Sequence, residues 1–217
     1  MADRSAVSRL MWWLGRRLYR LEVRDIENIP VEGACVIVWN HVAMTLDGLT
    51  IQAYKERRPD CITIGGSRVV AAQRRREAKK QTPGQESSSL AAYKARGLSA
   101  VELLKTLKFL KEGRAIALAP EGEMTWDGRL QHPLTPGAAW MALRGNVPVV
   151  PLIQFGGYDI HPRWKTTPYL TGRVTIRAGK PFYVQDGPPE KVTDEVIQEA
   201  SQRIYDEMAA VLALGHR

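Results

Sequence analysis

A histidine and an aspartate six positions apart are the first residues in this sequence whose types suit acid–base chemistry. His41 and Asp47 lie in the stretch VIVWNHVAMTLDGLT, where an apolar run ends in Asn-His and an Asp-Gly pair follows. A neutral imidazole beside a carboxylate can act as a general base, because the carboxylate fixes the tautomer and stabilises the imidazolium that forms. Two such residues also occur in ordinary turns, and this stretch alone leaves both interpretations open.

A second candidate group follows another apolar run, in the stretch ALAPEGEMTWDGRL. There Glu121 and Gly122 come directly after the residues expected to form a buried strand. Glycine lets a backbone approach a ligand closely, and the neighbouring carboxylate could hold a hydroxyl or orient a cation. The alternative is a turn that only ends the strand.

An arginine and two prolines mark further segments. Arg96, in AYKARGLS, precedes a long amphipathic segment. An arginine in a loop near a sheet edge suits phosphate capture, and it equally suits a solvated surface. Pro148 and Pro151 interrupt the apolar run NVPVVPL. Because proline cannot donate to a sheet, this pattern predicts an edge strand or the wall of a cleft.

Several other chemistries find no pattern in the sequence. It contains no G-x-S-x-G elbow, no Walker loop, and no G-x-G-x-x-G after a strand. Its four histidines and two cysteines are not spaced as metal ligands, so we expect no metal site. Cys35 and Cys61 both stand in apolar runs without a CxxC motif, which predicts reduced core residues in a cytosolic compartment.

Short apolar runs alternate with amphipathic segments along the chain, and these must position the candidate residues. Strands are expected over residues 34–39, 61–65, 115–120, 147–155 and 172–182, and helices over 45–54, 98–113, 135–146 and 192–214. The strands are too apolar to face water on one side. The pattern therefore predicts a single α/β domain with a mostly buried mixed sheet flanked by helices.

The net charge of +8 favours an anionic partner. Residues 1–22 are expected to form an amphipathic N-terminal helix, with Trp12 and Trp13 widening its apolar side and arginines largely on the other. Such a helix can pack on the domain, lie on an anionic membrane surface, or do both. No run reaches the roughly 18–20 apolar residues of a transmembrane helix. The six tryptophans are scattered and not interleaved with basic residues, so we expect no nucleic-acid partner.

Taken in order, these segments resemble the glycerolipid acyltransferase family, which includes the 1-acyl-glycerol-3-phosphate acyltransferases. VRDIENIPVEGACVIVWNH resembles the entry into the family's first motif, and ALAPEGEMTWDGRLQHPLTPGAAWMAL its third motif. VPVVPL resembles the fourth motif, and RVTIRAGKPF the strand that commonly follows. The resemblance covers residues from about 20 to 185. It implies a glycerol-3-phosphate acyltransferase-like fold, with residues 23–217 as the acyltransferase domain.

The resemblance also implies a mechanism. His41 would deprotonate an acceptor hydroxyl, Asp47 would orient the imidazole, and the hydroxyl would attack an acyl thioester without an acyl-enzyme. Glu121 and Gly122 would help to hold the acceptor, and Arg96 matches the arginine of the second motif that meets its phosphate. Acyl-CoA or acyl carrier protein would be the co-substrate, with no further cofactor. The implied location is peripheral, on the cytoplasmic face of a membrane.

Two departures from the family pattern bear on this mechanism. The family places four residues between the histidine and the aspartate, whereas five lie between His41 and Asp47. The turn must absorb the extra residue, or Asp47 rotates away from the imidazole and leaves a non-catalytic lipid-binding member. The third motif usually continues with Thr-Arg-Ser but here reads Glu-Met-Thr. Lysophosphatidic acid is the leading acceptor, and a glycolipid or an amino-acid lipid is the alternative.

Overall fold

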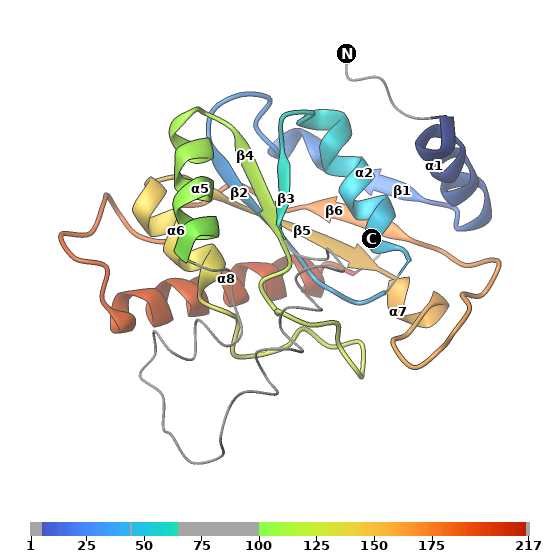
Figure 1. Ribbon diagram of the computed structural model, residues 1–217. Helices are drawn as coiled ribbons and strands as arrows, with labels where there is room; N and C mark the ends of the chain where they lie inside the picture. The colour runs from blue at the N-terminus through green and yellow to red at the C-terminus, as the bar shows by residue number, and fades with distance from the viewer. Residues whose placement is uncertain (1–5, 44, 65–99, 216–217) are drawn as a thin grey trace.

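A six-stranded mixed sheet is the framework of the computed structural model, which describes residues 6–43, 45–64 and 100–215 (Figure 1). The strand order is β1-β6-β5-β2-β4-β3. Neighbouring strands run parallel except β5 and β6, which are antiparallel. The expected mixed α/β sheet is therefore confirmed. The strands are β1 (Glu22–Arg24), β2 (Cys35–Trp39), β3 (Ile62–Ile64), β4 (Ala115–Leu118), β5 (Val149–Phe155) and β6 (Thr175–Ala178).

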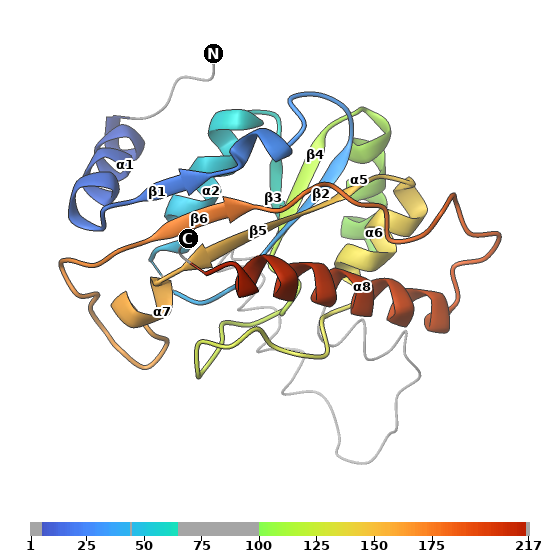
Figure 2. The same ribbon diagram turned by 180° about the vertical axis from the view of Figure 1, so that it is seen from behind.

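Helices cover both faces of this sheet. α5, α6 and α8 pack on one face, and α1 and α2 lie on the other (Figures 1 and 2). The expected helices are present, and the structure adds three short elements, β1, η1 and α7, which are too short to show a periodic pattern. The helices are α1 (Ala6–Leu18), η1 (Ile26–Asn28, a 3₁₀ turn), α2 (Asp47–Arg57), α5 (Ala100–Lys111), α6 (Gly137–Gly145), α7 (Gly157–Ile160) and α8 (Asp194–Ala213).

Strand β2 explains why its sequence is apolar without alternation. Ile37 and Trp39 contribute to the core on the α2 side, while Val36 and Val38 contribute to the core on the side of α6 and α8. None of these four side chains is more than 4% exposed. Because β2 is buried on both faces, its five residues are apolar, and the first polar side chains, Asn40 and His41, come directly after the strand ends at Trp39.

The two cysteines are unpaired and buried, as the sequence indicated. Burial raises the pKa of the Cys35 thiol to about 11 and that of Cys61 to about 12. Both side chains therefore remain protonated thiols in the core at neutral pH.

Of the two alternatives for the proline-containing strand, an edge strand or the wall of a cleft, the edge position is wrong. β5 lies inside the sheet, between β6 and β2. Its ladder with β6 ends at the pair Leu152 and Ala178, so Pro151 falls just beyond the last regular pair. The carbonyl of Pro151 still accepts a hydrogen bond from the Gly179 N–H at 2.8 Å. Pro151 has no N–H to donate, and this is tolerated because the regular ladder between β5 and β6 has already ended at Leu152.

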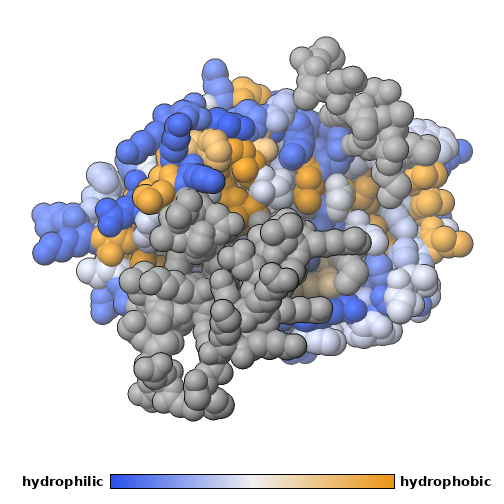
Figure 3. Space-filling view, viewed as in Figure 1, coloured by the Kyte–Doolittle hydropathy of each residue, from blue (hydrophilic) through white to orange (hydrophobic). Residues whose placement is uncertain are grey.

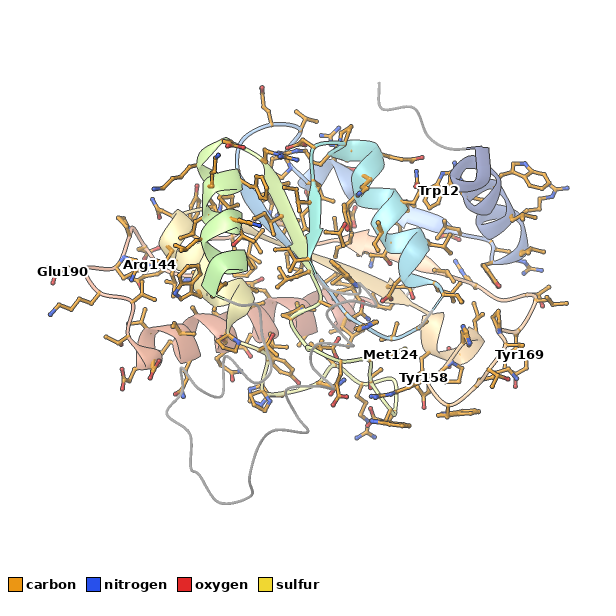
Figure 4. The ribbon with its side chains drawn as sticks, viewed as in Figure 1. Trp12, Met124, Arg144, Tyr158, Tyr169 and Glu190 are labelled. Carbon is orange, nitrogen blue, oxygen red and sulfur yellow. The ribbon has the colours of Figure 1, made fainter. Side chains whose placement is uncertain are left out.

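The N-terminal helix α1 packs on the domain. Trp12 is 8% exposed and lies between α1 and α2, whereas Trp13 is 60% exposed (Figure 4). Gly15 faces Leu49 of α2 so closely that a Cβ atom would lie 2.4 Å from its Cδ2. Among the described residues, no helix has both the length and the apolar character to cross a membrane. Hydrophilic side chains dominate the face in Figure 3, and apolar surface occurs between them in separate patches.

Candidate active site

The candidate residues meet at one edge of the sheet because three neighbouring strands end there. β2 runs parallel to both β4 and β5, so the carboxyl ends of all three lie at the same edge. His41 follows β2, Glu121 follows β4, and Gln154 lies near the end of β5. Open α/β sheets commonly place functional groups at this edge.

His41 and Asp47 are in direct contact despite the extra residue between them. Nδ1 of His41 lies 2.6 Å from Oδ2 of Asp47. The Asp47 N–H donates to the carbonyl of Ala43 at 3.3 Å, so the segment closes as a turn that leads into α2. Asp47 is the first residue of α2, where the helix dipole favours a carboxylate. The alternative in which Asp47 rotates away from the imidazole is therefore excluded by the geometry.

A buried glutamine holds this turn against the sheet. Nε2 of Gln154 donates to the carbonyl of Leu46 and to the hydroxyl of Thr50, each at 2.8 Å. The side chain of Asn40 in turn pairs with the backbone of Gln154: Nδ2 donates to its carbonyl at 2.9 Å, and Oδ1 accepts from its N–H at 2.7 Å. The sequence analysis did not single out Gln154. The sequence feature that could have identified it is a single amide residue in an otherwise apolar expected strand.

A second histidine, His161, contacts the turn between His41 and Asp47 through Thr45. Nδ1 of His161 lies 2.8 Å from the hydroxyl of Thr45, and its Nε2 lies 3.1 Å from the carbonyl of Lys165. His161 is 2% exposed, so both ring nitrogens are engaged inside the protein. We interpret His161 as a positioning residue for the turn between His41 and Asp47.

The environment of the pair shifts the pKa of both groups. Burial of the His41 ring opposes its protonation, but the adjacent Asp47 carboxylate and the charge of Glu121 outweigh burial, so the pKa of His41 is raised. Arg163 acts in the opposite sense and lowers it. Burial raises the pKa of Asp47, while its contacts with His41 and the Trp39 indole lower it less. The imidazole is thus a stronger base than an isolated histidine.

Glu121 binds the backbone on both sides of the site. Its Oε1 accepts from the His41 N–H at 2.6 Å, and its Oε2 accepts from the Gln131 N–H at 2.9 Å. The carbonyl of His41 accepts from the Thr125 N–H at 3.0 Å, so the loop after β4 holds the backbone of His41 twice. Burial raises the pKa of Glu121, and these N–H contacts offset part of that effect. Through the contact with its N–H, Glu121 positions His41.

Gly122 has a backbone that only glycine adopts readily. Its φ is +76°, and a Cβ atom would lie 2.7 Å from Cγ2 of Thr135. The Pro-Glu-Gly sequence therefore lets the loop turn tightly enough for Glu121 to reach His41. Arg96 lies outside the described residues. Among the residues that the structure describes, no group of three or more His, Cys, Asp or Glu side chains could hold a metal ion.

The open side of the imidazole is available for chemistry. The His41 side chain is 31% exposed, and its Nε2 has no hydrogen-bond partner within the described ranges. An imidazole that is held at Nδ1 by a carboxylate and is open at Nε2 can take a proton from a substrate hydroxyl. The site therefore has the arrangement of a general base for acyl transfer.

Comparison with known proteins gives the class of protein. A family model described as acyltransferase matches residues 20–154, more than half of the chain, and the chain belongs to this family. Among curated proteins, it is similar to 1-acyl-sn-glycerol-3-phosphate acyltransferase BAT2, chloroplastic, of Brassica napus, with 28% identity over 202 residues. That match covers 89% of this chain and 52% of the relative, so the chain spans about half the length of this curated protein.

A solved structure bears out the fold. The chain is similar to the crystal structure of the 1-acyl-sn-glycerophosphate (LPA) acyltransferase PlsC from Thermotoga maritima, with a TM-score of 0.61 and 21% identity. The match covers 100% of this chain and 85% of that chain. The acyltransferase fold and the resemblance to glycerolipid acyltransferases, both expected from the sequence, are confirmed.

Proposed function

We propose that this protein transfers a fatty acyl group from an acyl thioester to a hydroxyl of a lysophospholipid, in glycerolipid synthesis. The observation that carries the proposal is the 2.6 Å contact between His41 Nδ1 and Asp47 Oδ2 at the sheet edge of an acyltransferase-family chain. Lysophosphatidic acid is the leading acceptor, since both relatives are named for 1-acyl-glycerophosphates. Acyl-CoA or acyl carrier protein is the donor.

The proposed reaction is a direct transfer in one complex. Nε2 of His41 takes the proton of the acceptor hydroxyl while its oxygen attacks the thioester carbonyl carbon. The tetrahedral intermediate collapses with cleavage of the C–S bond, and the imidazolium returns the proton to the leaving sulfur. The products are an ester and a free thiol. Asp47 stabilises the imidazolium during the step, as its effect on the pKa of His41 requires.

Two alternatives differ in what they need from the site. A non-catalytic lipid-binding protein would not need a carboxylate beside the imidazole, and the contact between His41 and Asp47 counts against it. Transfer to a glycolipid or an amino-acid lipid needs the same base with different headgroup contacts. It stays open because Glu-Met-Thr follows Gly122 in place of the usual residues.

Release of free thiol from acyl-CoA, measured across a panel of lysolipid acceptors, tests the proposed function. We expect release that depends on acceptor and is fastest with lysophosphatidic acid, with the matching diacyl product found by mass spectrometry. The panel should include a lysoglycolipid and an N-acyl amino acid, and the assay should be repeated with acyl carrier protein. Acceptor-independent hydrolysis alone, or no release with any donor, would contradict the proposal.

We also propose that the protein is peripheral on the cytoplasmic face of an anionic membrane. A rim of exposed aromatic and apolar side chains follows Thr125 and α7 and supports contact with a membrane surface. Trp126 is 60% exposed, Trp164 64%, Tyr169 54% and Leu170 76%. Arg163 lies 4.1 Å from the Trp126 ring centroid and Lys165 lies 3.9 Å from that of Tyr169. Aromatic side chains paired with cations suit the headgroup region of a bilayer.

Replacing both rim tryptophans with serine tests the membrane proposal. We expect Trp126→Ser/Trp164→Ser to weaken co-sedimentation with anionic phospholipid vesicles about tenfold or more, since about 1.4 kcal/mol is a tenfold change and burying an aromatic side chain is worth more. Tyr183→Ser is the matched control, because Tyr183 is 49% exposed and follows Phe182, which pairs with the first residue of β5 at the opposite edge. Binding that ignores salt and the tryptophans would contradict this location.

A further inference from the structure

Arg163 brings a cation to the loop that holds His41. It follows α7 in the chain, and its Nη1 donates to the carbonyl of Met124 at 2.9 Å and to Oε2 of Glu123 at 3.0 Å. Met124 and Tyr158 lie at the end of the molecule where α7 lies (Figure 4). The guanidinium carbon lies 4.1 Å from the Trp126 ring centroid, so the ring supports one face of the group. The side chain is 28% exposed, which leaves the guanidinium accessible from solvent.

One peptide group connects Arg163 to the catalytic histidine. The carbonyl of Met124, which accepts from Arg163, and the N–H of Thr125 belong to the same peptide bond. That N–H donates to the carbonyl of His41 at 3.0 Å. The guanidinium is therefore connected through one peptide group to the backbone of His41. The positive charge of Arg163 acts on the imidazole, because it lowers the pKa of His41.

The guanidinium keeps donors for a ligand. In the described part of the chain, its hydrogen bonds use Nη1, while Nε and Nη2 have no acceptor. Glu123, its ion-pair partner, has a side chain that is 59% exposed, so water screens this pair. A planar guanidinium with two unused N–H groups matches the geometry of a phosphate, which it binds by two parallel hydrogen bonds.

We propose that Arg163 is a phosphate-recognition subsite beside His41, where a substrate phosphate binds while its hydroxyl or thioester reaches the base. The inference rests on the proposed function. In a glycerophosphate acceptor the phosphate is only a few bonds from the reacting hydroxyl, which fits a cation one peptide from His41. The phosphates of coenzyme A are the other source of the same chemistry. Arg163 contacts Glu123 and Met124, which belong to the stretch Glu-Met-Thr. At this stretch the family pattern usually reads Thr-Arg-Ser, so Arg163 brings a guanidinium to the place where the usual arginine is missing.

Steady-state kinetics of Arg163→Met test the subsite. Short-chain substrates that remain monomeric separate substrate recognition from membrane binding. We expect the KM for the phosphorylated substrate to rise roughly tenfold to a hundredfold, as for loss of a hydrogen bond to a charged group, with kcat little changed and partial recovery in Arg163→Lys. Arg144→Met is the matched control, since Arg144 is exposed and lies at the opposite end of the molecule (Figure 4).

Two substrate pairs identify which phosphate binds. A lysophosphatidic acid is compared with the uncharged monoacylglycerol, and acyl-CoA with acyl-pantetheine, which lacks phosphate. A KM effect confined to the phosphorylated acceptor assigns the subsite to the acceptor, and one confined to acyl-CoA assigns it to the donor. An equal KM for wild type and Arg163→Met with all four substrates would overturn the proposal.

The variant Glu123→Gln distinguishes phosphate recognition by Arg163 from a purely structural role of the ion pair between Arg163 and Glu123. A subsite predicts that removing the competing carboxylate leaves the KM for the phosphorylated substrate unchanged or lowers it. A purely structural ion pair predicts that Glu123→Gln raises the KM as Arg163→Met does, and that result would overturn the inference. Calorimetric binding of sn-glycerol 3-phosphate, weaker in Arg163→Met than in wild type, tests the subsite without catalysis. Absence of acyl transfer in wild type would count against the proposed function alone.

Discussion

Replacing His41 with alanine is expected to lower the rate of acyl transfer by about 10²–10⁴-fold, the usual contribution of a general base. The fold should persist, because the contacts of His41 with Glu121 and Thr125 are made by its backbone. The thiol-release assay with acyl-CoA and the best acceptor measures the loss. Glu121, the other carboxylate that contacts His41 in the described part of the chain, is not placed to replace it as the base, because both of its oxygens already accept backbone N–H groups.

A second histidine provides the control for this variant. His132 is exposed and pairs with Gln202 at 2.8 Å, so His132→Ala removes an imidazole away from the ion pair and should leave the rate unchanged. Thermal unfolding of both variants checks that each remains folded. If His41→Ala retained full transfer from acyl-CoA, His41 would not be the base and the proposed mechanism would be wrong.

Asp47→Asn should produce the second large loss, on the order of 10²–10⁴-fold in kcat/KM, with a change in pH dependence. The active form of His41 is neutral, so kcat/KM rises as the pH increases through the pKa of His41. The carboxylate of Asp47 raises that pKa, and removing its charge lowers it. The rising limb of the pH profile should therefore move to lower pH in Asp47→Asn, although the plateau falls.

Asp159→Asn is the control for this change of charge. Asp159 is exposed on the short helix α7, at the same end of the molecule, and should alter neither the plateau nor the limb by much. A pH profile of Asp47→Asn that keeps its limb in the wild-type position would show that Asp47 does not act through His41.

Most of the fold could be predicted from the sequence because its signals are local. The apolar runs at residues 34–39 and 147–155 lie in strands that are buried on both faces, which explains why almost all of their residues are apolar; Gln154, near the end of β5, is the buried polar exception. The amphipathic segments likewise predicted α5 and α8. The elements that were missed, β1 and α7, have three and four residues and carry no periodicity to detect. Of the two positions that Pro148 and Pro151 suggested for β5, the edge position was wrong, because a proline in one strand does not show where the ladder with the neighbouring strand ends.

The sequence by itself also placed His41 and Glu121 each directly after an apolar run, and the two meet because β2 and β4 are parallel neighbours whose carboxyl ends lie at one edge. It could not decide whether five intervening residues let Asp47 reach the imidazole. That depends on Gln154, whose side chain holds Leu46 from 108 positions away in the chain. Arg163 reaches Met124 in the same way, across 39 positions. Hydrogen bonds act over about 3 Å, so the contacts that complete this site exist only once distant segments have packed together.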